Sequence, residues 1–123
     1  FMVLKKAVDA PTLITFLKRL CKDAGRKVVL ILDNLNVHNA KDVRAWVAEH
    51  AHLIAIHYLP PYAPELNPDE YLNGDLKVQV ARRAPARDRG ELEKTATRRL
   101  RSLQRRPECV KKFFHHPRVQ YAA

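Results

Sequence analysis

The chain has 123 residues, of which 46% are hydrophobic and 29% are charged, and its formal net charge is +10. This length and composition suit a single folded domain of a soluble protein. No apolar run approaches the roughly 18 residues that a membrane-spanning helix needs, and no signal-peptide pattern opens the chain. Cys21 and Cys109 stand apart without metal-type spacing, which indicates reduced thiols and a cytoplasmic location.

The first third of the chain reads as a short apolar run, a helix and a strand. Phe1–Leu4 is the apolar run. Asp9 or Ala10 is placed to open a helix, and Gly25 is placed to end it. Lys27–Leu32 is a continuous run of apolar and β-branched residues, which is typical of a strand covered on both faces. Asp33 follows this predicted strand directly.

The middle of the chain repeats the alternation of helix and strand. A second helix is predicted from about Ala40 to Ala51, and another buried strand over Leu53–Leu59. After a proline-rich loop, Asn67 is predicted to cap a helix that starts at Pro68. Glu70 then occupies the third helical position, where the acid of a capping box belongs. This order predicts an α/β layer fold in which helices flank a central pair of parallel strands.

The last third of the chain is predicted to be helical. Asp88 is placed to open a long helix that runs to about Arg105. Pro107 then begins a short helix that ends near Phe114, and the residues after it are expected to be extended or irregular.

Nearly all of the excess positive charge lies between Lys77 and Lys112, where thirteen Lys and Arg residues stand against four acids for a net +9. A solvated helix face usually alternates its charges, and this segment does not. DNA phosphate is therefore the favoured partner, with a soluble basic helix as the alternative. An anionic membrane is disfavoured because the segment lacks a broad apolar face. The predicted DNA-binding residues are Lys77, Arg82, Arg83, Arg98, Arg99, Arg101, Arg105 and Arg106.

Two acids follow the two predicted strands: Asp33 at the end of one, and Glu70 at a helix start after the other. Either acid alone has a structural explanation, as the cap of a turn or of a helix. Because the carboxyl ends of parallel strands meet at one edge of a sheet, we expect the two carboxylates to face one cavity. Paired carboxylates suit Mg²⁺ or Mn²⁺, and beside a basic segment they predict phosphoryl transfer on a nucleic acid.

Three segments together resemble one protein family. They are ILDNLNVH (Ile31–His38), YLPPYAPELNPDEYLNGDLK (Tyr58–Lys77) and SLQRRPECVKKFFHHP (Ser102–Pro117). These motifs resemble the DDE-type transposases of bacterial insertion sequences, which are related to the mariner superfamily. The 36 residues between Asp33 and Glu70 fit the spacing of that family's second and third acids.

The resemblance implies a ribonuclease-H-like fold of the integrase and transposase type, whose metal-bound acids cut DNA at transposon ends and join the freed 3′-hydroxyl to target DNA. Asp33 would be the second catalytic acid and Glu70 the third, both as metal ligands. Asn34 and His38 match motif positions as accessory residues, and His38 either touches a phosphate or metal-bound water or holds the loop after the strand. A two-ion site with Mg²⁺ or Mn²⁺ is expected only in a complete domain.

The family's first aspartate has no counterpart here, because the only earlier acids, Asp9 and Asp23, flank a helix. We expect residues 1–83 to be the C-terminal part of an incomplete catalytic domain and residues 84–123 to be a basic helical extension packed on it. Such a chain is expected to be inactive alone, and to lie in the bacterial cytoplasm, associated with the nucleoid when bound to DNA. Its Lys27–Leu32 strand would lack a neighbour on one edge, so we expect a homo-oligomer formed by edge pairing or by exchange of a Phe1–Leu4 strand.

Two other functions stay open on the sequence alone. A non-catalytic DNA-binding protein, which could inhibit a complete transposase by assembling with it, needs the basic segment but not the carboxylates. Metal-dependent DNA cleavage distinguishes this protein from a transposase. A phosphohydrolase with Asp33 as nucleophile would normally carry a second acid two residues later, where this chain has Leu35.

Overall fold

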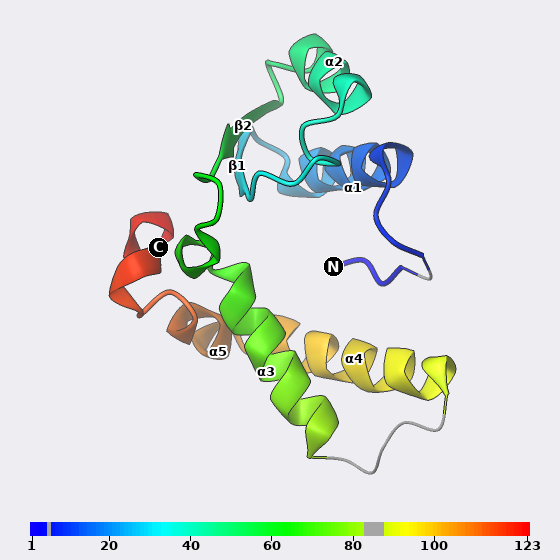
Figure 1. Cartoon of the computed structure of the whole chain (residues 1–123), viewed down its shortest axis with the longest axis vertical. Coiled ribbons are helices and arrows are strands. Elements are labelled where there is room, and N and C mark those ends of the chain that lie inside the picture. Colours follow the sequence, from blue (N-terminus) through cyan, green and yellow to red (C-terminus); the bar gives the residue numbers. More distant parts are fainter. Residues whose placement is uncertain (5, 83–87) are drawn as a thin grey trace. The chain divides into compact units, whose positions relative to one another are not determined.

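The computed structural model describes residues 1–4, 6–82 and 88–123. The chain divides into two compact units, Met2–Ala63 and Pro64–Ala123 together with Phe1, which we call the N-terminal and the C-terminal unit. Within the described ranges, no helix combines the length and the apolar character needed to cross a membrane. The elements in chain order (Figure 1) are α1 (Ala10–Ala24), β1 (Val28–Leu32), α2 (Lys41–Glu49), β2 (Ile54–Tyr58), η1 (Pro64–Leu66), α3 (Asp69–Ala81), α4 (Arg89–Gln104), α5 (Pro107–Lys112) and η2 (Pro117–Ala122).

The helix α1 begins and ends where the sequence predicts. The Asp9 carboxylate accepts a hydrogen bond from the Thr12 backbone N–H at 2.8 Å, as an N-cap residue does. Gly25 ends the helix with a φ of 62°, a left-handed conformation that costs glycine little. Leu13 and Leu17 are one helical turn apart and are both buried, so the apolar stripe of α1 faces the core.

The predicted parallel strands form the centre of the N-terminal unit. Their register runs from Val28 opposite Ile54 to Leu32 opposite Tyr58. The connection between them contains α2, which makes a strand–helix–strand unit as predicted. α1 contacts β1 and α2, and α2 contacts β2. The buried core of this unit consists of Leu13, Leu17, Val43, Trp46 and Ile54.

The prediction that β1 is covered on both faces is wrong. Burial alternates along the strand: Val29 is 64% and Ile31 is 37% exposed, whereas Val28 and Leu30 pack against the core. Successive side chains of a strand point to opposite faces of its sheet. The core residues of α1 and α2 lie on the face of Val28 and Leu30, so the face of Val29 and Ile31 stays exposed.

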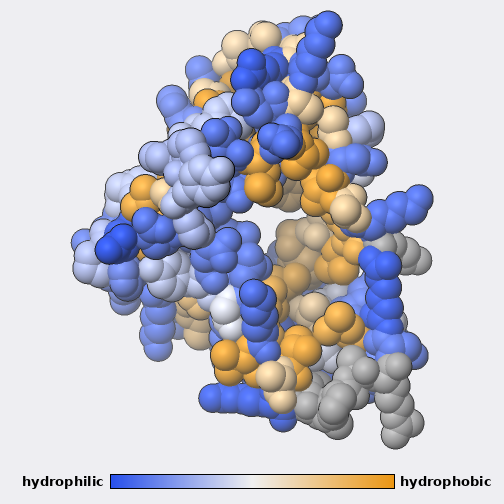
Figure 2. Space-filling view, in the orientation of Figure 1, coloured by the Kyte–Doolittle hydropathy of each residue, from blue (hydrophilic) through white to orange (hydrophobic). Residues whose placement is uncertain are grey.

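The prediction of a strand at Phe1–Leu4 is also wrong, because these residues lie in no helix or strand. Among the described residues the sheet consists of β1 and β2, and the edge of β1 away from β2 has no strand beside it. Figure 2 shows apolar residues exposed among hydrophilic ones on one face of the molecule. Part of the apolar surface of this chain therefore remains outside its small core.

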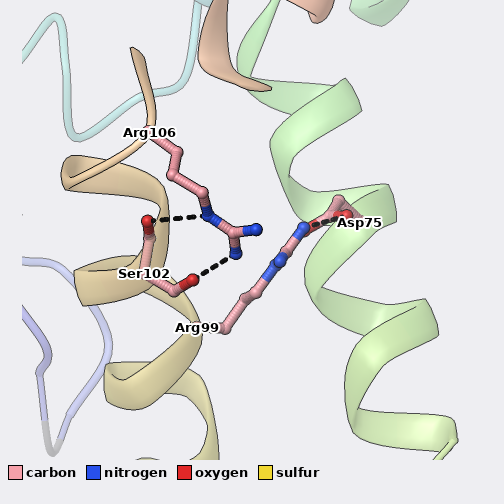
Figure 3. A network of polar contacts seen from close by, with 4 residues as sticks. All are labelled: Asp75, Arg99, Ser102 and Arg106. Carbon is pink, nitrogen blue, oxygen red and sulfur yellow. Dashed lines mark hydrogen bonds and ion pairs between the residues drawn. The ribbon is translucent and has the colours of Figure 1, made fainter. Parts of the chain in front are cut away.

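The C-terminal unit is built from α3, α4 and α5 with the short helices η1 and η2. The Asp88 carboxylate accepts the Glu91 backbone N–H at 2.8 Å and caps α4, as predicted. α4 contacts α3, and Leu103 on α4 is only 3% exposed. Arg99 reaches from α4 to Asp75 on α3 and donates two hydrogen bonds of 2.8 Å to its carboxylate (Figure 3).

The end of the chain is helical, and not extended or irregular as the sequence suggested. η2 spans Pro117–Ala122, and Val119 within it is fully buried. The His116 ring accepts the Arg118 backbone N–H at 3.3 Å and caps the first turn. η2 contacts η1, about fifty positions earlier in the chain. A contact over this distance leaves no trace in local sequence periodicity, which explains the error.

Candidate functional site

Asp33 stands where the sequence places it, directly after the carboxyl end of β1. The neighbouring backbone N–H of Leu59 donates to the Leu32 carbonyl at 2.7 Å, so both strands continue together to this edge. The Asp33 carboxylate Oδ1 lies 2.7 Å from the His38 ring Nδ1, and its side chain is 37% exposed. The carboxylate is therefore held at one oxygen and accessible to solvent.

His38 fixes the orientation of Asp33. Its Nδ1 lies 3.0 Å from the Asp33 carbonyl oxygen as well as 2.7 Å from the carboxylate. Both partners are acceptors, so Nδ1 must carry the hydrogen. The loop is itself held, because the Tyr58 hydroxyl donates to the His38 carbonyl at 2.8 Å from the end of β2. Of the two accessory candidates, His38 is 16% exposed and bound to Asp33, whereas Asn34 is exposed.

Glu70 lies in the first turn of α3, in the C-terminal unit. The helix begins one residue later than predicted, with Pro68 as N-cap and Glu70 at its second position. Asn67 still holds the turn, because its side chain accepts the Asp69 backbone N–H at 3.0 Å. Proline has no backbone N–H, so Glu70 cannot form a capping box with Pro68. Glu70 is thus an exposed acid in the first turn of α3 that forms no capping box.

The predicted DNA-binding residues divide into two groups. Lys77, Arg82, Arg98, Arg101 and Arg105 are exposed. The paired residues are Arg99, which bonds to Asp75, and Arg106, which folds back onto the Ser102 side chain (Figure 3). The hydrogen bonds that Arg99 donates to the Asp75 carboxylate raise the pKa of Arg99, so this contact is a charged pair. Arg83 lies outside the described residues.

Four exposed cations form a stripe along α4. A helix advances about 100° per residue, so residues spaced by four, three and four positions lie within about 60° of one another. Lys94, Arg98, Arg101 and Arg105 have this spacing, and all four are exposed. Eleven residues rise by about 16 Å along a helix, which is the length of the stripe. Lys94 was missing from the predicted DNA contacts, although its position four residues before Arg98 was the signal that could have found it.

The donor chemistry at these sites fits a hard divalent cation. Asp33 and Glu70 supply carboxylate oxygens, which Mg²⁺ and Mn²⁺ prefer. Asp33 belongs to the N-terminal unit and Glu70 to the C-terminal unit, and each is accessible within its own unit. Among the described residues, no three His, Cys, Asp or Glu side chains cluster as a ready metal site.

Comparison with known proteins identifies the family. A family described as DDE superfamily endonuclease matches residues 1–93, from the start of the chain to the fifth residue of α4. This range contains Asp33, His38 and Glu70. No curated protein and no solved structure matches the chain. DDE endonucleases act on DNA and generally use divalent metal ions. Because the match covers most of the sequence, the chain belongs to the DDE superfamily endonucleases.

Proposed function

We propose that this chain is part of a DNA transposase of a bacterial insertion sequence, related to the mariner superfamily. The observation that carries the proposal is how the two acids are held and how far they are exposed. Asp33 is oriented by His38 at the end of β1 and is open to solvent, and Glu70 is exposed at the start of α3 without a capping role. Both occupy the positions of the family's second and third acids. A complete protein of this kind would cut DNA at transposon ends and join it to a target.

Asp33 and Glu70 are the residues that would hold Mg²⁺ or Mn²⁺. Such ions, when bound, activate a nucleophile and stabilise the leaving oxygen on phosphorus. The parallel sheet with α1 and α2 on one face is compatible with an incomplete ribonuclease-H-like fold. Within that fold, His38 keeps Asp33 in one orientation through its Nδ1 hydrogen.

We further propose that residues 1–83 belong to the catalytic domain and residues 84–123 form a basic extension packed on it. The contact between α3 and α4, which the Asp75–Arg99 pair bridges, supports this packing. The α4 stripe of Lys94, Arg98, Arg101 and Arg105 presents its charges away from α3 and would bind DNA phosphates. Such binding falls steeply with salt, because counterions are released from the DNA.

The metal site is tested with Mn²⁺, whose unpaired electrons broaden nearby NMR signals. We expect Mn²⁺ to broaden backbone signals around both Asp33 and Glu70, and Asp33→Asn to weaken this effect at both positions. Asp23→Asn is the matched control, since Asp23 is an exposed acid in the last turn of α1. Broadening confined to one of the two positions, or an equal effect of the control variant, would show that the two acids do not share an ion.

DNA cleavage separates the transposase from the second candidate function, a non-catalytic DNA-binding or inhibitory protein. The α4 stripe favours DNA binding in either case, because it does not involve the carboxylates. We expect little or no cleavage of duplex DNA by the 123-residue chain with Mg²⁺ or Mn²⁺, since two of the family's three acids are matched. Strong cleavage that Asp33→Asn abolishes would contradict the expected inactivity and remove the non-catalytic alternative.

A further inference from the structure

The segment that delivers Glu70 is held by the end of the chain. The Tyr121 hydroxyl donates to the Leu66 carbonyl at 2.6 Å, and Arg118 reaches Glu65 at 3.4 Å. Both contacts bind η2 to η1, which immediately precedes the turn at Asn67. They join residues 53 to 55 positions apart in the sequence.

A third contact reaches the first turn of α3. The rings of Tyr71 and His116 lie with their centroids 5.4 Å apart at an angle of 34°. Tyr71 follows Glu70 directly in the chain. Within η2 the side chain of Val119 is fully buried, whereas Arg118 and Tyr121 beside it are exposed. The end of the chain therefore holds η1 and the turn that carries Glu70.

The start of α3 needs such external support. Its N-cap residue, Pro68, makes no side-chain capping bond. The local bonds are those of Asn67, whose carbonyl accepts the Glu70 backbone N–H at 3.1 Å and whose side chain accepts that of Asp69. Asn67 itself donates its backbone N–H to Pro64 in η1 at 2.9 Å. The position of Glu70 thus depends on η1, and η1 is held by η2.

We propose that residues 116–122 are a clasp that sets the position of Glu70, with Tyr121 and Val119 as positioning residues. The clasp lies beyond residues 1–93, which the family match covers. Its role for a metal ion rests on the proposed function, but its hold on residues 64–71 does not. A clasp of this kind makes the last residues of the chain necessary for the geometry of an acid about fifty positions earlier.

Hydrogen exchange measured without metal tests the clasp in the full chain. Tyr121→Phe removes the bond to Leu66, and Val119→Ala removes buried packing. Each should speed backbone exchange over residues 64–71 about fivefold, as expected for loss of one such interaction, and leave α4 nearly unchanged. Tyr62→Phe is the matched control, because it deletes the hydroxyl of a fully exposed tyrosine and should change nothing. Unchanged exchange in both variants, or equal acceleration throughout α4, would overturn the clasp.

Mn²⁺ affinity provides the second measurement. Tyr121→Phe should weaken Mn²⁺ binding about threefold while the unfolding temperature stays close to that of the wild type. An unchanged affinity would overturn the positioning role. Absence of Mn²⁺ binding in the wild type would instead remove the proposed metal site, and the exchange measurement would then decide the clasp alone.

Discussion

At the residue scale, two adjacent arginines have different roles. Arg98 and Arg99 look equivalent in the sequence, yet they lie about 100° apart around α4. Arg98 is exposed in the α4 stripe, whereas Arg99 is paired with Asp75, and the side chains of that pair are only 23% and 20% exposed. The charge that a residue carries therefore does not indicate whether it is available to DNA.

Substitution of the two arginines should separate binding from stability. Arg98→Gln should weaken DNA binding and reduce the slope of log affinity against log salt by about one, because one phosphate contact is lost. Arg99→Gln should leave this slope unchanged and lower the free energy of unfolding by about 1–3 kcal/mol, because Asp75 loses its charged partner. Salt titrations and denaturant unfolding of both variants provide the measurements. A loss of DNA affinity only in Arg99→Gln would contradict the assignment of the stripe.

At the element scale, α1 depends on a charged cap. Hydrogen bonds from the Thr12 side chain and then from its backbone N–H lower the pKa of Asp9. A carboxyl group whose pKa is lower in the folded state stabilises the fold above its unfolded pKa. That contribution disappears as the pH falls through the folded pKa.

The pH dependence of this cap can be isolated with two variants. Asp9→Asn keeps an acceptor oxygen but cannot ionise. The wild type loses the contribution of its charged cap as the pH falls from about 6 to about 2, so the unfolding temperature of Asp9→Asn relative to the wild type should rise over that range. Asp9→Ala removes the acceptor and should be less stable than Asp9→Asn across that range. A constant difference between the wild type and Asp9→Asn would show that ionisation of Asp9 does not stabilise α1.

At the scale of the whole molecule, the sheet has an exposed edge and an exposed apolar face through which two chains could associate. β1 has no strand on its outer edge among the described residues, and Val29 and Ile31 on one face are exposed. Unpaired strand edges offer backbone N–H and C=O groups to other chains. We therefore expect the chain to form homo-oligomers through β1.

Self-association can be tested by adding charge to this face. Val29→Lys should shift the chain towards monomer in sedimentation or light scattering, since a charged side chain disfavours pairing at an edge strand. Val78→Lys, on α3, is the matched control because Val78 is 49% exposed outside the sheet, and it should have no effect. A stable 14.2 kDa monomer of the unmodified chain would contradict the prediction.

Local sequence was enough to predict the features that depend on neighbouring residues. The caps Asp9 and Asp88 and the terminating Gly25 mark helix ends because their effects act within one turn. The two strands followed from continuous apolar runs, and their parallel pairing followed from the intervening helix. Asp33 could be placed at a strand end for the same reason, and the motifs around Asp33 and Glu70 resembled the family that the match over residues 1–93 shows.

Tertiary contacts set the features that depend on distant partners. Whether Arg98 or Arg99 faces solvent depends on where α3 lies, and the one-sided cover of β1 depends on where α1 and α2 pack. The helical end of the chain and its hold on η1 join residues about fifty positions apart, beyond the reach of any periodicity. Sequence patterns report the preferences of a segment for its own neighbours, whereas packing between segments determines which of its side chains are left exposed.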